Sequence, residues 1–171
     1  MEPQFRTGTR VFRSHDNERM VFYTLGLPTA PAVLLLHGYS GSSLTQWWDR
    51  GIAAQIAAAG YYAVGLDLRG HGASARPESA GSYTEGQELR DIVSLADHLG
   101  LSNYAAVGYS HGAIETAKLL TVDPGRVACG VIGGMGDLLT DASWRESYGI
   151  GTIAAALEGR ARGEPLAGVP L

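Results

Sequence analysis

The chain has 171 residues, a formal net charge of −4 and 45% hydrophobic residues, which indicates one globular domain with a sizeable core. Its 13 Lys and Arg residues form no basic patch, so nucleic acid is not an expected partner. The single cysteine, Cys129, excludes an internal disulfide and favours a cytoplasmic location, and neither a signal peptide nor a membrane-spanning run is expected.

The N-terminal part predicts a β-hairpin followed by a buried strand. Apolar and polar residues alternate over residues 10–24, and Asp16 and Asn17 in their centre are typical of a tight turn. Residues 32–36 are continuously apolar. A short run of this kind indicates a strand that is covered on both faces, as in a parallel sheet.

The chain then alternates helices with strands. Apolar spacing predicts helices over 48–59, 87–99 and 113–120 and strands over 61–66, 104–107 and 127–132. Thr84 and Gln87 have the spacing of a capping box for the second helix. The alternation predicts an α/β fold, a mostly parallel sheet with helices on both faces, in which ligands bind beyond the C-terminal strand ends.

One of these strand ends carries the motif G-x-S-x-G, at Gly108-Tyr109-Ser110-His111-Gly112. An apolar strand precedes it and a helix follows, which is the context of a nucleophile elbow. The two glycines allow a strained serine backbone and a close approach of strand and helix. The N-terminus of the following helix also favours negative charge beside the serine oxygen.

Two further motifs follow the preceding strands in order: His37-Gly38-Tyr39 and the segment 67–74, which reads DLRGHGAS. With the elbow, they make the chain resemble the N-terminal part of an α/β-hydrolase of the small-esterase, C–C hydrolase and perhydrolase-like group. The resemblance covers about residues 10–137. The family's branches with an aspartate nucleophile, dehalogenases and epoxide hydrolases, are disfavoured because the elbow holds a serine.

The resemblance implies that Ser110 is the nucleophile and that the backbone N–H groups of His111 and Tyr39 form the oxyanion hole. It implies a small-molecule substrate and neither a cofactor nor a metal. Other side chains of these motifs are expected to be structural. We interpret His37 as a loop histidine, and we expect Asp67 and Arg69 to hold their loop by hydrogen bonds to each other.

The sequence does not supply a complete catalytic triad. In this fold the chain order is Ser, then an acid, then His. After Ser110 the only histidine is the adjacent His111, which cannot turn back onto the serine with triad geometry. Asp137, directly after the strand at 127–132, is the best-placed acid, and some members of the family carry the acid there.

The core over 1–137 is expected to be an incomplete hydrolase domain, truncated after the sixth strand, and 138–171 the start of a lid or cap. The leading hypothesis is a serine hydrolase for a small ester, thioester or vinylogous ketone that is nearly inactive as this chain. The alternative is a non-catalytic α/β-hydrolase-like binding module or pseudoenzyme. A perhydrolase or acyltransferase would share the same elbow, and the strand edge near 127–132 could mediate self-association.

Overall fold

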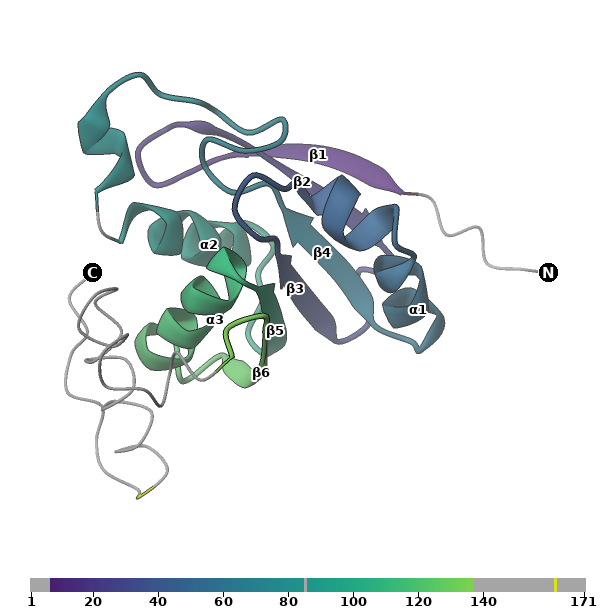
Figure 1. Ribbon diagram of the computed structural model, residues 1–171. Helices are drawn as coiled ribbons and strands as arrows, with labels where there is room; N and C mark the ends of the chain where they lie inside the picture. The colour runs from purple at the N-terminus through teal and green to yellow at the C-terminus, as the bar shows by residue number, and fades with distance from the viewer. Residues whose placement is uncertain (1–6, 85, 137–161, 163–171) are drawn as a thin grey trace.

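The computed structural model describes residues 7–84, 86–136 and 162 (Figure 1). The elements in chain order are β1 (Gly8–Arg13), β2 (Arg19–Leu25), β3 (Ala32–Leu36), a π-helical turn (Leu44–Trp48), α1 (Ile52–Ala58), β4 (Tyr62–Leu66), a 3₁₀ turn (Ala80–Tyr83), α2 (Gln87–His98), β5 (Tyr104–Tyr109), α3 (His111–Val122) and β6 (Val127–Gly133). Within these ranges no helix is both long and apolar enough to cross a bilayer.

The six strands form one sheet with the order β1-β2-β4-β3-β5-β6. The strands β3, β4, β5 and β6 are parallel, whereas β2 runs antiparallel to both β1 and β4. In Figure 1, α1 covers one face of the sheet and α2 and α3 cover the other. The predicted α/β class with a mostly parallel sheet is therefore confirmed.

Alternating residues of the central strand β3 face opposite sides of the sheet, and both sides are dry. Val33 and Leu35 belong to the hydrophobic cluster under α1, and Leu34 and Leu36 belong to the cluster under α2. All are at most 7% exposed. Burial on both faces explains why the sequence shows an unbroken apolar run here and no polar alternation.

The hairpin of β1 and β2 forms around the predicted turn. The Ser14 N–H donates to the carbonyl oxygen of Glu18 at 3.0 Å, and the Asn17 N–H donates to the carbonyl oxygen of Ser14 at 2.9 Å. Asn17 has a φ of 67°, a left-handed conformation that Asn tolerates better than most residues.

The helix predicted over 48–59 is wrong as one element. A π-helical turn ends at Trp48, and α1 begins only at Ile52, because Gly51 between them has a φ of 71°. The Gly51 N–H donates to the carbonyl oxygen of Trp48 at 2.9 Å and closes the first turn. A left-handed residue cannot continue a right-handed helix, so the chain changes direction there.

The capping box predicted at the start of α2 is also not formed. The N-cap residue is Gly86, with a φ of 84° and no side-chain cap. The Thr84 hydroxyl donates to the carbonyl oxygen of Gly81 at 3.1 Å and so stabilises the preceding 3₁₀ turn. The end of α1 follows the prediction, since Gly60 adopts a φ of 88° directly after it.

Strand β6 is the last strand in the sheet order, and no other described strand pairs with its outer edge. It carries exposed side chains, among them Cys129 and Val131, the latter 57% exposed. An apolar edge with unpaired backbone groups is a template for pairing with another chain.

We expect this edge to mediate self-association, because it carries exposed apolar side chains and no strand in the described part of the chain pairs with its outer backbone groups. Val131→Lys should shift the chain toward monomer, as judged by light scattering on a gel-filtration column. Val11→Lys is the matched control, because Val11 is 47% exposed on the opposite edge strand β1. A wild-type chain that stays monomeric at high concentration would contradict the expectation.

Candidate active site

Ser110 lies on a strained turn between β5 and α3, as the elbow motif predicts. Its φ of 52° and ψ of −113° fall outside the regions that non-glycine residues normally occupy. The Ser110 N–H donates to the carbonyl oxygen of Gly133, at the end of β6, at 2.8 Å. The unusual backbone is therefore held by a hydrogen bond from a neighbouring strand, and not by local preference.

The two glycines of the motif are required by crowding. A Cβ atom added to Gly108 would lie 2.0 Å from the carbonyl oxygen of Gly112. One added to Gly112 would lie 2.1 Å from the carbonyl oxygen of Leu36. Strands β3 and β5 and helix α3 thus meet here with room for hydrogen atoms only.

We expect Gly108→Ala and Gly112→Ala each to lower the free energy of unfolding by about 3 kcal/mol or more, at the upper end of the cost of overpacking. Urea unfolding followed by circular dichroism would measure the loss. Gly125→Ala is the control, because a Cβ there meets nothing within 4 Å. A loss of under about 0.5 kcal/mol at all three positions, the range of ordinary surface substitutions, would be incompatible with this crowding.

The register of the sheet brings the loop after β3 to the elbow. Leu36 of β3 pairs with Gly108 of β5, so Tyr39 and Ser110 both lie just beyond the same end of the sheet. A Cβ added to Gly38 would lie 3.5 Å from the Cβ of Ser110. The loop is therefore in contact with the serine.

The backbone N–H groups of Tyr39 and His111 make no hydrogen bond to another residue in the described part of the chain. Both belong to segments that converge on Ser110, one from the loop after β3 and the other from the start of α3. Unpaired N–H groups beside a serine are what an oxyanion hole requires. Their role as oxyanion donors stays a prediction.

The side chain of His111 contacts α2, and not Ser110. Its Nε2 lies 2.6 Å from a carboxylate oxygen of Glu88. This hydrogen bond, with the charge of the carboxylate, raises the pKa of His111, although partial burial opposes it. No hydrogen bond joins Ser110 to any histidine among the described residues, so the general base is not found there.

His37 has the structural role expected from the sequence. It is fully buried, and its Nδ1 lies 2.8 Å from the carbonyl oxygen of Gly38 while its Nε2 accepts a hydrogen bond from the Leu68 N–H at 3.0 Å. Burial lowers the pKa of His37, which favours the neutral ring that this arrangement needs. His71 likewise orders its own loop, because its Nδ1 lies 2.9 Å from the carbonyl oxygen of Arg69.

The predicted pairing of Asp67 with Arg69 is wrong. Asp67 accepts hydrogen bonds from the N–H groups of Ser43 and Ala73, both at 2.8 Å, and so joins the loops after β3 and β4. Arg69 points toward α2, where its Nη2 and Nε lie 2.7 and 2.9 Å from the two carboxylate oxygens of Asp91. Neighbouring residues in the sequence thus stabilise the same loop from different sides.

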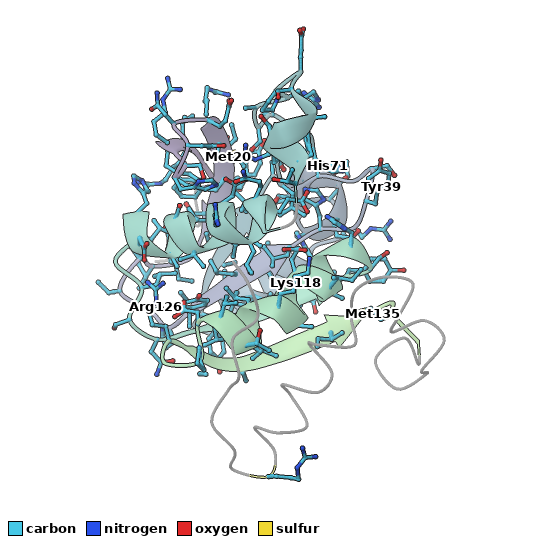
Figure 2. The ribbon with its side chains drawn as sticks, turned by 90° about the vertical axis from the view of Figure 1, so that its left-hand side faces the viewer. Met20, Tyr39, His71, Lys118, Arg126 and Met135 are labelled. Atoms are coloured by element: carbon cyan, nitrogen blue, oxygen red, sulfur yellow. The ribbon has the colours of Figure 1, made fainter. Side chains whose placement is uncertain are left out.

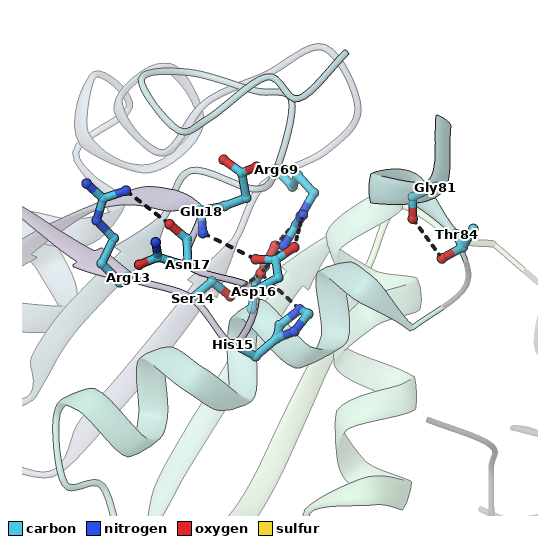
Figure 3. A network of polar contacts seen from close by, with 10 residues as sticks. Arg13, Ser14, His15, Asp16, Asn17, Glu18, Arg69, Gly81 and Thr84 are labelled. Carbon is cyan, nitrogen blue, oxygen red and sulfur yellow. Dashed lines mark hydrogen bonds and ion pairs between the residues drawn. The ribbon is translucent and has the colours of Figure 1, made fainter. Parts of the chain in front are cut away.

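A polar network around Arg69 fastens the hairpin to the loop after β4 (Figure 3). The guanidinium also lies 2.6 Å from Asp16 in the hairpin turn, and the Ser14 hydroxyl donates to Asp91. This contact with the guanidinium lowers the pKa of Asp16. His15, Asp16 and Asp91 lie close enough together to share a cation, and the guanidinium already supplies the positive charge at this place.

We expect Asp91→Asn to lower the free energy of unfolding by about 3–5 kcal/mol, because it leaves the buried Arg69 guanidinium without its main partner. Chemical unfolding would measure the effect. Asp97→Asn on the same helix is the control. Asp97 is 62% exposed and pairs with Arg126, so its loss should cost about 0–1 kcal/mol. Equal losses in the two variants would refute a buried ion pair.

A cavity of about 650 Å³ lies beside the elbow, within the range of small-molecule sites. Its walls carry aromatic rings and charges of both signs, supplied among others by Tyr39, His71, Tyr83, Glu88, His111 and Lys118. Glu115 also lines it, and its pKa is raised by burial, with Lys118 bonded to it at 2.8 Å.

The predicted acid, Asp137, lies outside the described residues, as does the segment 138–171 except for Arg162. The described core ends just after β6. The prediction that Asp137 orients a catalytic histidine therefore stays a prediction.

The sequence comparison places the chain in a family. Residues 31–163 match the model of the alpha/beta hydrolase fold family, and the chain belongs to that family. Among curated relatives, an epoxide hydrolase of Caballeronia sordidicola is 38% identical over 96 residues, which cover 56% of this chain and 28% of that protein. Epoxide hydrolase A of Mycobacterium tuberculosis is 38% identical over 100 residues, covering 57% of this chain and 30% of that protein. The chain thus spans less than a third of these relatives.

Solved structures agree with the fold. Epoxide hydrolase A of Mycobacterium thermoresistibile matches with a TM-score of 0.67 and 26% identity, over 73% of this chain and 38% of that one. A thioesterase domain from the curacin biosynthetic pathway matches with a TM-score of 0.65 and 28% identity, over 71% and 44%. The predicted family is confirmed. These two curated relatives, however, are epoxide hydrolases, the branch that Ser110 led us to disfavour, and not members of the small-esterase, C–C hydrolase and perhydrolase-like group.

Proposed function

We propose that this protein is a serine hydrolase that acts by acyl transfer on a small ester or thioester. Ser110 is the nucleophile, and the N–H groups of Tyr39 and His111 bind the developing oxyanion. The observation that carries the proposal is the strained backbone of Ser110, beside which two N–H groups have no partner among the described residues. The likeness to a thioesterase domain supports it as well.

The chemistry needs both parts of this arrangement. The oxygen of Ser110 attacks the carbonyl carbon, and the carbonyl oxygen takes up negative charge that two fixed N–H donors stabilise. One such donor was worth about 2.7–4 kcal/mol in a measured case. The tetrahedral intermediate expels the alcohol or thiol, leaving an acyl ester on Ser110, and water then releases the acid. The N-terminus of α3 adds a favourable dipole.

The proton of Ser110 requires a general base, which none of the described histidines provides. In a serine protease, loss of the base costs roughly 10⁶ in turnover. Since residues 112–171 contain no histidine, we expect acylation by this chain to be slow. The cavity beside Tyr39 and His111 supports a second candidate, a binding module that uses the cavity and the N–H donors without turnover.

Epoxide hydrolysis is a third candidate, suggested by the names of the curated relatives. The nucleophile argues against it. A carboxylate that opens an epoxide forms an ester, which water can cleave, whereas the Ser110 oxygen would form an ether, which it cannot. A serine at this position therefore fits substrates that already carry an acyl group.

An acylation experiment tests the proposal. After incubation with p-nitrophenyl acetate, mass spectrometry should find one acetyl group on the wild-type chain, located at Ser110. Ser110→Ala should lose it, whereas Ser102→Ala, at an exposed serine near the start of β5, should keep it. Labelling that persists in Ser110→Ala would overturn the proposal, as would Ser110-dependent conversion of styrene oxide to its diol.

A further inference from the structure

We propose that Glu88 is a positioning residue for the oxyanion hole: through the rings of His111, His71 and Tyr39 it holds the two N–H donors in place. The inference rests on the proposed function. Its basis has two parts. Tyr39 and His111, the expected backbone donors, also contact each other through their rings, and His111 is bonded to Glu88 of α2.

The first link connects the two helices. Glu88 lies in the first turn of α2, and His111 is the first residue of α3. The 2.6 Å contact between the carboxylate and Nε2 therefore ties the start of the elbow helix to α2. The side chains of Glu88 and His111 are 20% and 27% exposed, so the contact is largely shielded from water.

The second link is a cluster of three rings. The ring centroid of His71 lies 6.4 Å from that of His111 and 5.4 Å from that of Tyr39. The rings of Tyr39 and His111 are themselves 6.2 Å apart, nearly perpendicular. Figure 2 shows Tyr39 and His71 close together at one end of the molecule, far from Arg126. The side chains of the two donor residues therefore contact each other and share His71 as a neighbour.

His71 is itself fixed. Its Nδ1 lies 2.9 Å from the carbonyl oxygen of Arg69, whose guanidinium is held by the buried Asp91. Glu88 on one side and the Arg69 network on the other thus enclose the ring cluster. Tyr39 is the most exposed of the three rings, at 76%.

The link from Glu88 depends on the charge of His111. Glu88 raises the pKa of His111 above its ordinary value, so the charged pair forms below that pKa and becomes a neutral hydrogen bond as the pH rises through it. The titratable and charged groups that face His111 are Glu88 from α2, Glu115 and Lys118 from α3, His71 and His37 from the loops after β4 and β3, and Tyr39.

Titration followed by ¹H–¹⁵N NMR tests the proposal on the full 171-residue chain. In the wild type, the backbone amide signals of His111 and Tyr39 should move with one common midpoint, above the ordinary 6.5 of histidine. In Glu88→Gln the midpoint should fall, and the movement of the Tyr39 amide should shrink at least about twofold. Asp97→Asn is the matched control, an ion-pair loss at the far end of α2, and should behave as the wild type.

A Tyr39 amide that does not move with His111 in the wild type would overturn the proposal, even if the variants fail to fold. An unchanged midpoint in Glu88→Gln would overturn it as well. The readout needs no reactive serine, so it is independent of acylation. If the amides of Tyr39 and His111 share a midpoint but Ser110 is not acylated, only the proposed acyl transfer is overturned. If Ser110 is acylated but the two amides share no midpoint, only the positioning by Glu88 is overturned.

Discussion

The close approach of β3, β5 and α3 is the constraint on which the site depends. Leu36 pairs with Gly108, and neither Gly108 nor Gly112 could carry even a Cβ atom. Because the backbones meet at this distance, the loop after β3 reaches Ser110 and two N–H groups remain beside it. A larger separation would leave the serine on an ordinary turn.

Polar side chains around this contact hold the neighbouring loops in place. Asp67 joins the loops after β3 and β4, and Arg69 fastens the second loop to α2 and to the hairpin. Asp67 and Arg69 both have hydrogen-bond partners within the protein, which explains how their charges can be buried near the candidate site. Family membership is settled by the sequence match, whereas the choice of substrate rests on the identity of Ser110.

The sequence predicted the features that local patterns encode. The unbroken apolar run of β3 and the glycine spacing around Ser110 each have one simple structural cause, and both were confirmed. The partners of Arg69 could not be read from the sequence, because Asp91 and Asp16 reach it only after the chain has folded. The one available signal was an acid at position 91, on the apolar face of an amphipathic helix. The break at Gly51 was missed because apolar spacing continues across it.

The elbow has no stability of its own. The pairing that crowds it joins positions 36 and 108, and the hydrogen bond that restrains Ser110 comes from Gly133, on a later strand. Closing a loop of that length costs entropy that only the assembled sheet offsets. The strained conformation is therefore a property of the whole sheet: the same five residues cut out as a peptide, or grafted onto an open loop, would relax to an ordinary turn.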